Sequence, residues 1–325
     1  VIAVEPRLMA RRTPADPANA ESREVIEAQA GQVWFPDSSF KTAQAIEDFN
    51  RGENLPLIIF ANWRGFSGGT RDMYQEVLKF GAKIVDALRT YKHPVYVYIP
   101  PCGELRGGSW VVVDPTINED MMEMYADQES RGGILEPPGI CEVKFRKPDQ
   151  LKTMHRLDDE LMALDAKLAK AGGEESVAIK AHITKREDTL LPLYTQIAHE
   201  FADLHDRAGR MKAKGVVRDV LSWKRSREYF YWRVQRRQAE MRLRKTIVDA
   251  DPNLSFSEVS DKMVGMAGSV DWENDQAVSS WLKDDASKIS ATVNAMKADG
   301  VASSIEKMLS KLPADARADL VKRLR

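Results

Sequence analysis

The fold of this chain is decided by the stretch LPLIIFANWRGFSGGTRD, residues 55–72. A continuous apolar run of strand length leads into a loop with three glycines, and a periodic apolar pattern opens after it at Met73. We therefore expect a strand, a loop and a helix in that order, the kind of junction at which α/β proteins carry sites. The glycines let a ligand approach the backbone N–H groups, and Arg64 offers a planar fork of donors for a carboxylate or phosphate.

Downstream of these glycines the sequence predicts a parallel βαβ unit. Apolar residues recur at helical spacing over residues 72–90, and PVYVYI at 94–99 follows as a second buried strand. The sequence GELRGGSW at 103–110 then repeats the arrangement of a glycine-rich loop after a strand. Because such loops lie at the same ends of neighbouring parallel strands, we expect the two to face one crevice.

The expected domain boundaries lie where the pattern of alternating strands and helices changes to long charged helices. Residues 1–222 are typical of an α/β domain with a helical insertion at about 148–205, and residues 223–325 are typical of a helical extension. The insertion is expected to hold helices over 151–171 and 177–205, the second kinked or broken at its proline, and to project as a hairpin.

Two further local expectations concern the first 150 residues. The segment 19–30 is compatible with one short helix. A third loop rich in glycine and proline, at 125–139, is expected to end in a strand over 140–145.

Composition and charge exclude several classes of function. The 325 residues are 43% hydrophobic, enough for a large core, and 48 basic residues balance 49 acidic ones. Overall charge therefore gives no argument for a nucleic-acid or membrane partner, and no apolar run is long enough for a membrane span.

Only Cys102 and Cys141 are present, so we expect reduced thiols and a cytoplasmic location, with a plastid as the alternative. The chain opens on the strand-like run VIAV, as expected of a piece cut from a longer protein.

Residues 224–245 carry nine Lys or Arg against two acidic residues, interleaved with aromatic residues. One interpretation is a stripe that binds nucleic acid or phosphate. The interpretation that we favour is a helix with an aromatic core face and solvated or paired arginines, because the rest of the chain adds no positive field.

Sequence motifs leave two chemistries open. There is no Walker loop, dinucleotide fingerprint or metal-ligand spacing of Cys and His, so we expect no metal. A Gly-x-Ser-x-Gly motif surrounds Ser67 and would make it the nucleophile of a hydrolase, with Asp114 as the acid and His155 or His205 as the base. A nucleophile elbow turns sharply off its strand, whereas residues 62–64 intervene here.

The second chemistry is an oxyanion site. Backbone N–H groups in the loops at 65–69 and 107–109 could stabilise a negative oxygen in a transition state, at about 3 to 4 kcal/mol per donor. The alternative is that the glycines only make tight turns. Two loops at adjacent strand ends, one with Arg64 and the other with Arg106, favour a functional site.

Several longer stretches resemble one known family. They are NWRGFSGG at 62–69, ELRGGSWVV at 104–112, MEMYAD at 122–127 and FADLHD at 201–206, with shorter matches in ADPAN at 15–19 and GQVW at 31–34. Together they resemble the carboxyltransferase domain of eukaryotic, multidomain acetyl-CoA carboxylase. The likeness runs from Val1 to about Trp232 and is weak from Thr246 on.

The resemblance implies a crotonase-like (ClpP-like) β/α superhelix. The family's carboxyltransferase has two such halves, and this chain resembles the second, so the N-terminal carboxyltransferase half is missing. The family's active site lies between the first half of one protomer and the second half of its partner, which implies a homodimer.

The resemblance also implies a reaction. In this family a carboxyl group moves from N1′ of carboxybiotin to acetyl-CoA and gives malonyl-CoA, the first committed step of fatty acid synthesis. Biotin arrives on a biotin carboxyl carrier domain outside this chain, and coenzyme A is part of the substrate. The biotin nitrogen can accept the substrate proton, so no protein base is required. Isolated, the chain is expected to be inactive, and a docking or dimerisation module without catalysis is the remaining alternative.

Site residues follow from the resemblance residue by residue. The N–H groups of Phe66 and Gly108 would face the ureido oxygen of biotin, and Arg64 would hold the migrating carboxylate. The biotin pocket would be lined by Gly68, Gly107, Glu136 and Gly139, and the phosphates of CoA would meet Lys144 and Arg146.

Overall fold

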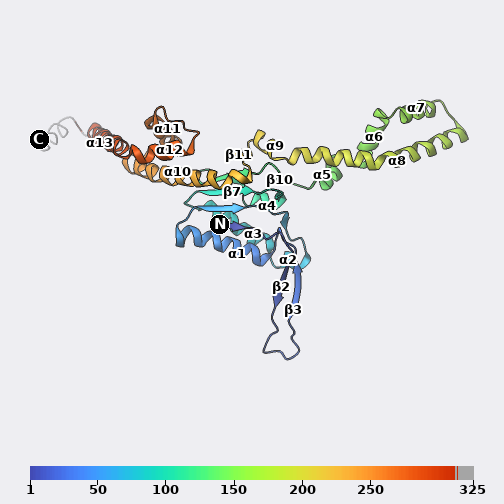
Figure 1. The fold of residues 1–325 in the computed structure, drawn as a ribbon, viewed down its shortest axis with the longest axis horizontal. Helices are drawn as coiled ribbons and strands as arrows, with labels where there is room; N and C mark the ends of the chain where they lie inside the picture. Colours follow the sequence, from blue (N-terminus) through green and yellow to red (C-terminus); the bar gives the residue numbers. More distant parts are fainter. Residues whose placement is uncertain (312, 314–325) are drawn as a thin grey trace. The chain divides into compact units, whose positions relative to one another are not determined.

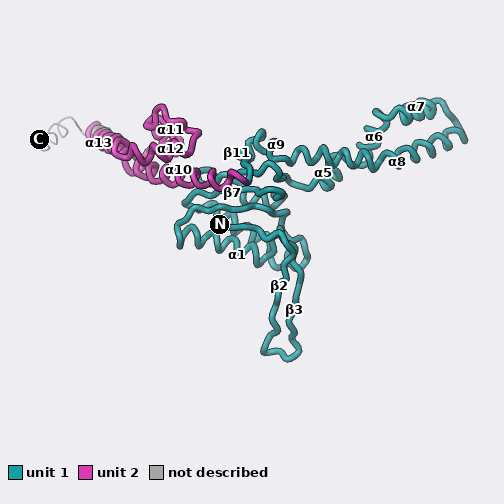
Figure 2. Tube along the Cα trace, in the orientation of Figure 1, with its two compact units in different colours: residues 1–223 teal, residues 224–325 magenta. Residues whose placement is uncertain are grey.

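The computed structural model describes residues 1–311 and residue 313, and the chain divides into two compact units (Figure 1, Figure 2). Unit 1 comprises Val1–Trp223 and unit 2 comprises Lys224–Arg325. Each unit has a buried apolar cluster of its own. None of the helices in the described part of the chain is long and apolar enough to span a bilayer.

Unit 1 is built on a five-stranded parallel sheet in the order β1-β5-β7-β9-β11. Its strands are β1 (Ile2–Ala3), β5 (Leu57–Phe60), β7 (Val95–Ile99), β9 (Met122–Ala126) and β11 (Asp219–Val220). The strand expected in the opening stretch is β5, and it pairs with β7 as predicted, Leu57 opposite Val95. All residues of β7 are buried, which explains why its sequence is continuously apolar and aromatic.

Short strands follow the main strands and form smaller parallel pairs. These pairs are β4 (Val33–Trp34) with β6 (Gly65–Phe66), and β8 (Glu104–Arg106) with β10 (Arg131–Gly133). A parallel bridge between Trp63 and Leu105 connects them. The chain thus repeats a main strand, a short strand and a helical segment three times, beginning at β5, β7 and β9. This repeat is a β/α superhelix, so the predicted crotonase-like architecture is confirmed.

The helices of these repeats correct one prediction and refine another. They are α2 (Thr70–Tyr74), α3 (Val77–Arg89), α4 (Gly107–Val111) and α5 (Pro137–Lys144), and α1 (Pro36–Glu47) packs against α3. The helix expected over 72–90 is interrupted at Glu76, whose φ is +62°. The strand expected over 140–145 is wrong: α5 occupies most of it, because two prolines start a helix where their missing N–H groups cost nothing.

An antiparallel hairpin of β2 (Met9–Thr13) and β3 (Val25–Gln29) extends from unit 1 (Figure 1). The short helix expected within 19–30 is therefore wrong. Pairing with β2, more than ten residues away, decides the conformation of β3, and the local sequence does not contain that information. An ion pair between Arg71 and Glu27, at 2.5 Å, links α2 to the hairpin.

The insertion is a hairpin of helices with its own core. Its helices are α6 (Lys147–Leu157), α7 (Asp159–Leu168) and α8 (Gly173–Asp206), followed by α9 (Ala208–Ala213), and α6 and α7 lie along α8 (Figure 1). The single helix expected over 151–171 is divided because Asp158 leaves the helical conformation and accepts the N–H of Leu161 as an N-cap. α8 runs through Pro192 without a break.

Unit 2 is entirely helical in its described residues. Its helices are α10 (Trp223–Ala250, which begins at the last residue of unit 1), α11 (Phe256–Ala267), α12 (Asp275–Asp284) and α13 (Ala286–Ser310). The basic stretch lies in α10, where Arg233 and Arg236 are buried against Asp275 at 2.9 and 3.0 Å. Glu240 accepts from Arg236 at 2.7 Å and from Arg237 at 3.3 Å. These arginines are paired in the interior, as the favoured interpretation predicted.

Candidate active site

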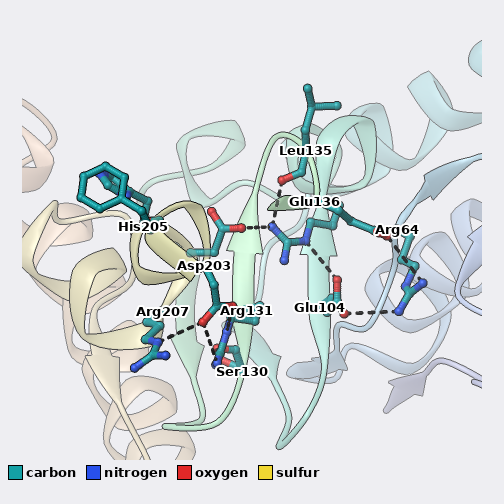
Figure 3. A network of polar contacts seen from close by, with 12 residues as sticks. Arg64, Glu104, Ser130, Arg131, Leu135, Glu136, Asp203, His205 and Arg207 are labelled. Carbon is teal, nitrogen blue, oxygen red and sulfur yellow. Dashed lines mark hydrogen bonds and ion pairs between the residues drawn. The ribbon is translucent and has the colours of Figure 1, made fainter. Parts of the chain in front are cut away.

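Arg64 lies just after β5, where the main sheet gives way to the short strands. Its N–H donates to the carbonyl of Gln32 at 2.7 Å, which fixes the backbone. Its side chain is 48% exposed, with Nη2 at 3.3 Å from Glu104 Oε1 and Nη1 at 3.5 Å from Glu136 Oε1 (Figure 3). Strong guanidinium–carboxylate bonds are about 2.7–2.9 Å long. Arg64 is therefore held loosely enough to exchange a protein carboxylate for a ligand carboxylate.

The side chain of Phe66 brings the two glycine-rich loops together. A Cβ added to Gly81 of α3 would lie 2.7 Å from its ring, and one added to Gly108 of α4 would lie 3.2 Å from it. The ring also packs on Trp34, with 5.2 Å between centroids. A side chain at Gly81 would force the ring to move, one at Gly108 would only crowd it, and Phe66 thus lies beside the start of α4.

Two helices begin at the site without a side-chain cap. Gly107 starts α4 with φ +50°, and Arg106 at its N-cap makes no side-chain bond to the first turn. Glu136 likewise precedes α5 without capping it. The first-turn N–H groups of a helix have no partner within the helix, and those of Gly108 and Gly139 are among the groups at the starts of α4 and α5.

Arg106, the arginine of the second glycine-rich loop, is buried, unlike Arg64. Its side chain is only 4% exposed and is ion-paired with Asp206, which is equally buried. Its Nε donates to Glu104 Oε2 at 3.1 Å, and Nη1 donates to the carbonyl of Leu135 at 3.1 Å. Burial alone would lower the pKa of Arg106, but the bonds to Asp206 and Glu104 outweigh it and raise the pKa, so the guanidinium stays charged. Arg106 is therefore a structural cation beside the site.

Glu104 and Asp206 are polar members of the site that the sequence argument assigned no role. Glu104 bridges the two arginines, one through each carboxylate oxygen. Its N–H donates to Asn62 Oδ1 at 3.0 Å, which joins the two glycine-rich loops. The signal that could have identified them is their place in the family-like stretches ELRGGSWVV and FADLHD.

A second ion pair anchors the end of α8 to β10. Arg131 donates to both carboxylate oxygens of Asp203, at 2.7 and 3.2 Å, and Arg207 donates to the same group at 3.1 Å (Figure 3). These arginines hold the pKa of Asp203 below its usual value. The insertion thus ends at the site through two neighbouring aspartates, Asp203 and Asp206.

The residues of a serine hydrolase are not assembled into a triad. Ser67 Oγ donates to Asp72, five residues further on. Asp114 accepts the indole N–H of a tryptophan four residues before it at 2.8 Å. His155 bonds to two carboxylates inside the insertion, and His205 Nδ1 lies 2.8 Å from the carbonyl four residues before it. The nucleophile, acid and base of the hydrolase hypothesis therefore have other partners.

The remaining predicted residues lie at the surface. Lys144 ends α5 and Arg146 precedes α6; both are exposed, and neither forms an ion pair with any described residue. Gly68 is exposed, and a Cβ built on it would meet nothing within 4 Å. In the part of the chain that the structure describes, no cluster of three or more His, Cys, Asp or Glu is arranged to bind a metal.

Comparison with known proteins identifies the family. Residues 1–238 match the carboxyl transferase domain family. Acetyl-CoA carboxylase of Schizosaccharomyces pombe is 50% identical over 95% of this chain, and that of Dictyostelium discoideum is 53% identical over 87%. The matches cover 14% and 13% of those proteins, so the chain spans about one seventh of its curated relatives. The beta subunit of Pseudomonas aeruginosa geranyl-CoA carboxylase, at 15% identity, aligns with a TM-score of 0.43 over 70% of this chain and 35% of that one. With its family-matching region extending over most of its length, this chain belongs to the carboxyl transferase domain family.

Proposed function

We propose that the chain supplies the biotin-side half of the carboxyl-transfer site of an acetyl-CoA carboxylase, which carboxylates acetyl-CoA to malonyl-CoA. The observation that carries this proposal is the placement of Arg64, half exposed and loosely paired beside two uncapped helix starts. The names of the relatives support acetyl-CoA as the acceptor.

The residues around Arg64 fit a ureido ring that carries a carboxylate. Carboxybiotin, when bound, supplies the activated carboxyl group. Arg64 orients that carboxylate through two parallel N–H donors, a geometry that a lysine cannot reproduce. The N–H groups of Phe66 and Gly108 stabilise negative charge on the ureido oxygen, at about 3 kcal/mol per donor. Gly68, Gly107, Glu136 and Gly139 line the pocket, with the glycines leaving room for the ring.

The acyl-CoA is held by cations without a protein partner. Lys144 and Arg146 are exposed near the end of α5 and form no ion pair in the described chain. A free surface lysine or arginine is a suitable partner for a phosphate. We assign Lys144 and Arg146 to the phosphates of coenzyme A, which would then bind near the end of α5.

This chain forms only one side of the reaction site. Donors for the thioester oxygen of the acceptor come from the other carboxyltransferase half, contributed by a dimer partner, and biotin arrives on its carrier domain. The chain covers only 14% and 13% of two relatives, so the rest of such a protein is long enough to contain the other carboxyltransferase half and the carrier domain. The non-catalytic alternative, docking or dimerisation alone, leaves the loosely paired Arg64 without a role.

The proposal is tested by malonyl-CoA formation in the full-length protein. Arg64→Ala is expected to lower kcat by at least about 100-fold, because the carboxylate loses its orienting contact. Ser67→Ala should retain near wild-type kcat, and Arg71→Ala, which removes an exposed ion pair with Glu27, is the matched arginine control. Loss of activity in the Ser67 variant together with full activity in the Arg64 variant would favour the hydrolase and refute the proposal.

A further inference from the structure

A buried ion pair beneath β10 joins two segments that lie one hundred residues apart. The side chains of Arg106 and Asp206 are each 4% exposed. A Cβ on Gly133 would lie 2.7 Å from Asp206 Oδ1 and 3.2 Å from Arg106 Nη1. The pair therefore lies directly against the strand, where only glycine leaves space for it.

The guanidinium of Arg106 contacts one carboxylate beside Arg64 and the backbone next to the other. Its Nε bonds to Glu104 Oε2, and the other oxygen of Glu104 accepts from Arg64. Its Nη1 bonds to the carbonyl of Leu135, the residue before Glu136. One buried cation thus fixes the side chain of the first carboxylate and the backbone next to the second.

We propose that Arg106, held in place by Asp206, is a positioning residue for carboxyl transfer that acts by orienting Arg64. The inference rests on the function proposed above. Three acceptors in different directions require the planar fork of a guanidinium, and an ammonium group does not match that geometry. Loss of Asp206 leaves a buried charge without its main partner, which draws the guanidinium away from the other acceptors.

A neighbouring ion pair, Arg131 with Asp203, provides a control that distinguishes an effect on Arg64 from the anchoring of α8. Arg131 lies on β10, the strand that pairs with the β8 strand of Arg106, and it pairs with Asp203 at the same end of α8 (Figure 3). Its other side-chain bonds go to the carbonyls of Glu129 and Ser130. The side chain of Arg131 thus anchors the same end of α8 without bonding to Glu104, the carbonyl of Leu135 or Arg64, which makes Arg131→Lys a matched control.

The test measures malonyl-CoA formation by the full-length protein carrying Arg106→Lys, Asp206→Asn or the control, each alone and combined with Arg64→Lys. Arg106→Lys and Asp206→Asn are expected to lower kcat about 10- to 100-fold, the effect of displacing a positioned group by about 1 Å. KM for acetyl-CoA should stay within about twofold, because the phosphate contacts lie elsewhere. Arg131→Lys should leave kcat within about twofold. In the Arg64→Lys background, Arg106→Lys should cost less than about threefold, since the group through which it acts is already changed.

Three outcomes would overturn the inference. The first is that the losses of kcat in Arg106→Lys and Arg64→Lys are fully additive in the double variant. The second is that Arg131→Lys loses as much kcat as Arg106→Lys. The third is that Arg106→Lys keeps the wild-type kcat. Hydrogen exchange of residues 134–139 gives a readout independent of catalysis: it should accelerate in Arg106→Lys and Asp206→Asn but not in the control. Unchanged exchange refutes the positioning role even if one variant folds poorly. If instead the wild-type protein forms no malonyl-CoA, or Arg64→Ala keeps its activity, the proposed function fails while exchange still decides whether Arg106 orders this loop.

Discussion

Adding one methyl group to α3 is predicted to slow carboxyl transfer through the ring of Phe66. The Cβ of a Gly81→Ala variant would lie 2.7 Å from two ring carbons of Phe66. Carbon atoms in ordinary contact are about 3.5–4.0 Å apart, so the ring must retreat by roughly 1 Å. The space behind it is limited by Gly108 and by Trp34, and the displacement therefore passes to the backbone of Phe66. A shift of about 1 Å in a positioned group can cost about 100-fold in rate, and we expect kcat to fall 10- to 100-fold.

The stability of the same variant is expected to change much less than its rate. Overpacking a core costs about 1–3 kcal/mol, whereas replacing glycine by alanine inside a helix contributes about 1 kcal/mol in the opposite direction. The net loss for Gly81→Ala is then about 0–2 kcal/mol. A large loss of rate with a small loss of stability distinguishes displacement of a catalytic backbone group from simple unfolding.

The assay compares kcat for malonyl-CoA formation with urea unfolding for Gly81→Ala and a control. Gly265→Ala is the control because Gly265 lies inside α11 and its added Cβ would meet nothing within 4 Å. It should be slightly more stable than wild type, with unchanged kcat. Combining Gly81→Ala with Phe66→Leu removes the clash and should recover part of the rate. Wild-type kcat in Gly81→Ala would refute the coupling between this ring and the proposed oxyanion donor.

Two further predictions concern ion pairs away from the site. Hydrogen bonds that His155 donates to Asp165 and Glu187 raise its pKa, so the stabilisation is complete below about pH 6.5 and is lost as the pH rises through the raised pKa. In urea unfolding, His155→Gln should therefore cost about 1 kcal/mol at pH 6 and less at pH 9, and a cost that does not vary with pH would contradict this. Glu240→Gln should lower the free energy of unfolding of unit 2 by about 3 kcal/mol in thermal or urea unfolding, since the buried Arg236 and Arg237 lose the negative charge that they share. An unchanged unfolding midpoint would contradict this.

The fold could be predicted from sequence where a segment's own pattern determines its structure. Strand β7 is buried on both faces, and β5 is buried on one face and half-buried on the other, so their continuous apolar sequences identify them without reference to the rest of the chain. The failures have non-local or single-residue causes. β3 is a strand because β2 pairs with it, and the break before α3 depends on the left-handed conformation of Glu76, which interrupts a helix without interrupting its apolar periodicity.

In the site, too, the features set by local sequence could be predicted and those set by distant partners could not. The glycine-rich loops after the strands were predicted to come together, and the structure packs the ring of Phe66 close to Gly108. Whether an arginine in such a loop faces a ligand or the interior depends on partners elsewhere in the chain. Arg106 resembles Arg64 in its local sequence setting, yet Asp206, one hundred residues later, draws it into the interior. Local pattern carries no information about such a partner, and only the family-like word FADLHD indicated that the segment mattered.

The charge around Arg64 supports the view that the chain forms half of a site. Two arginines, Arg64 and Arg106, stand against three carboxylates, those of Glu104, Glu136 and Asp206. Such a cluster does not attract another carboxylate by its net charge. A substrate carboxylate binds only if it displaces a protein carboxylate, and Glu136 is the candidate because it is 49% exposed and 3.5 Å from Arg64. Positive charge from outside this chain would favour that exchange, in agreement with the proposal that another carboxyltransferase half completes the site.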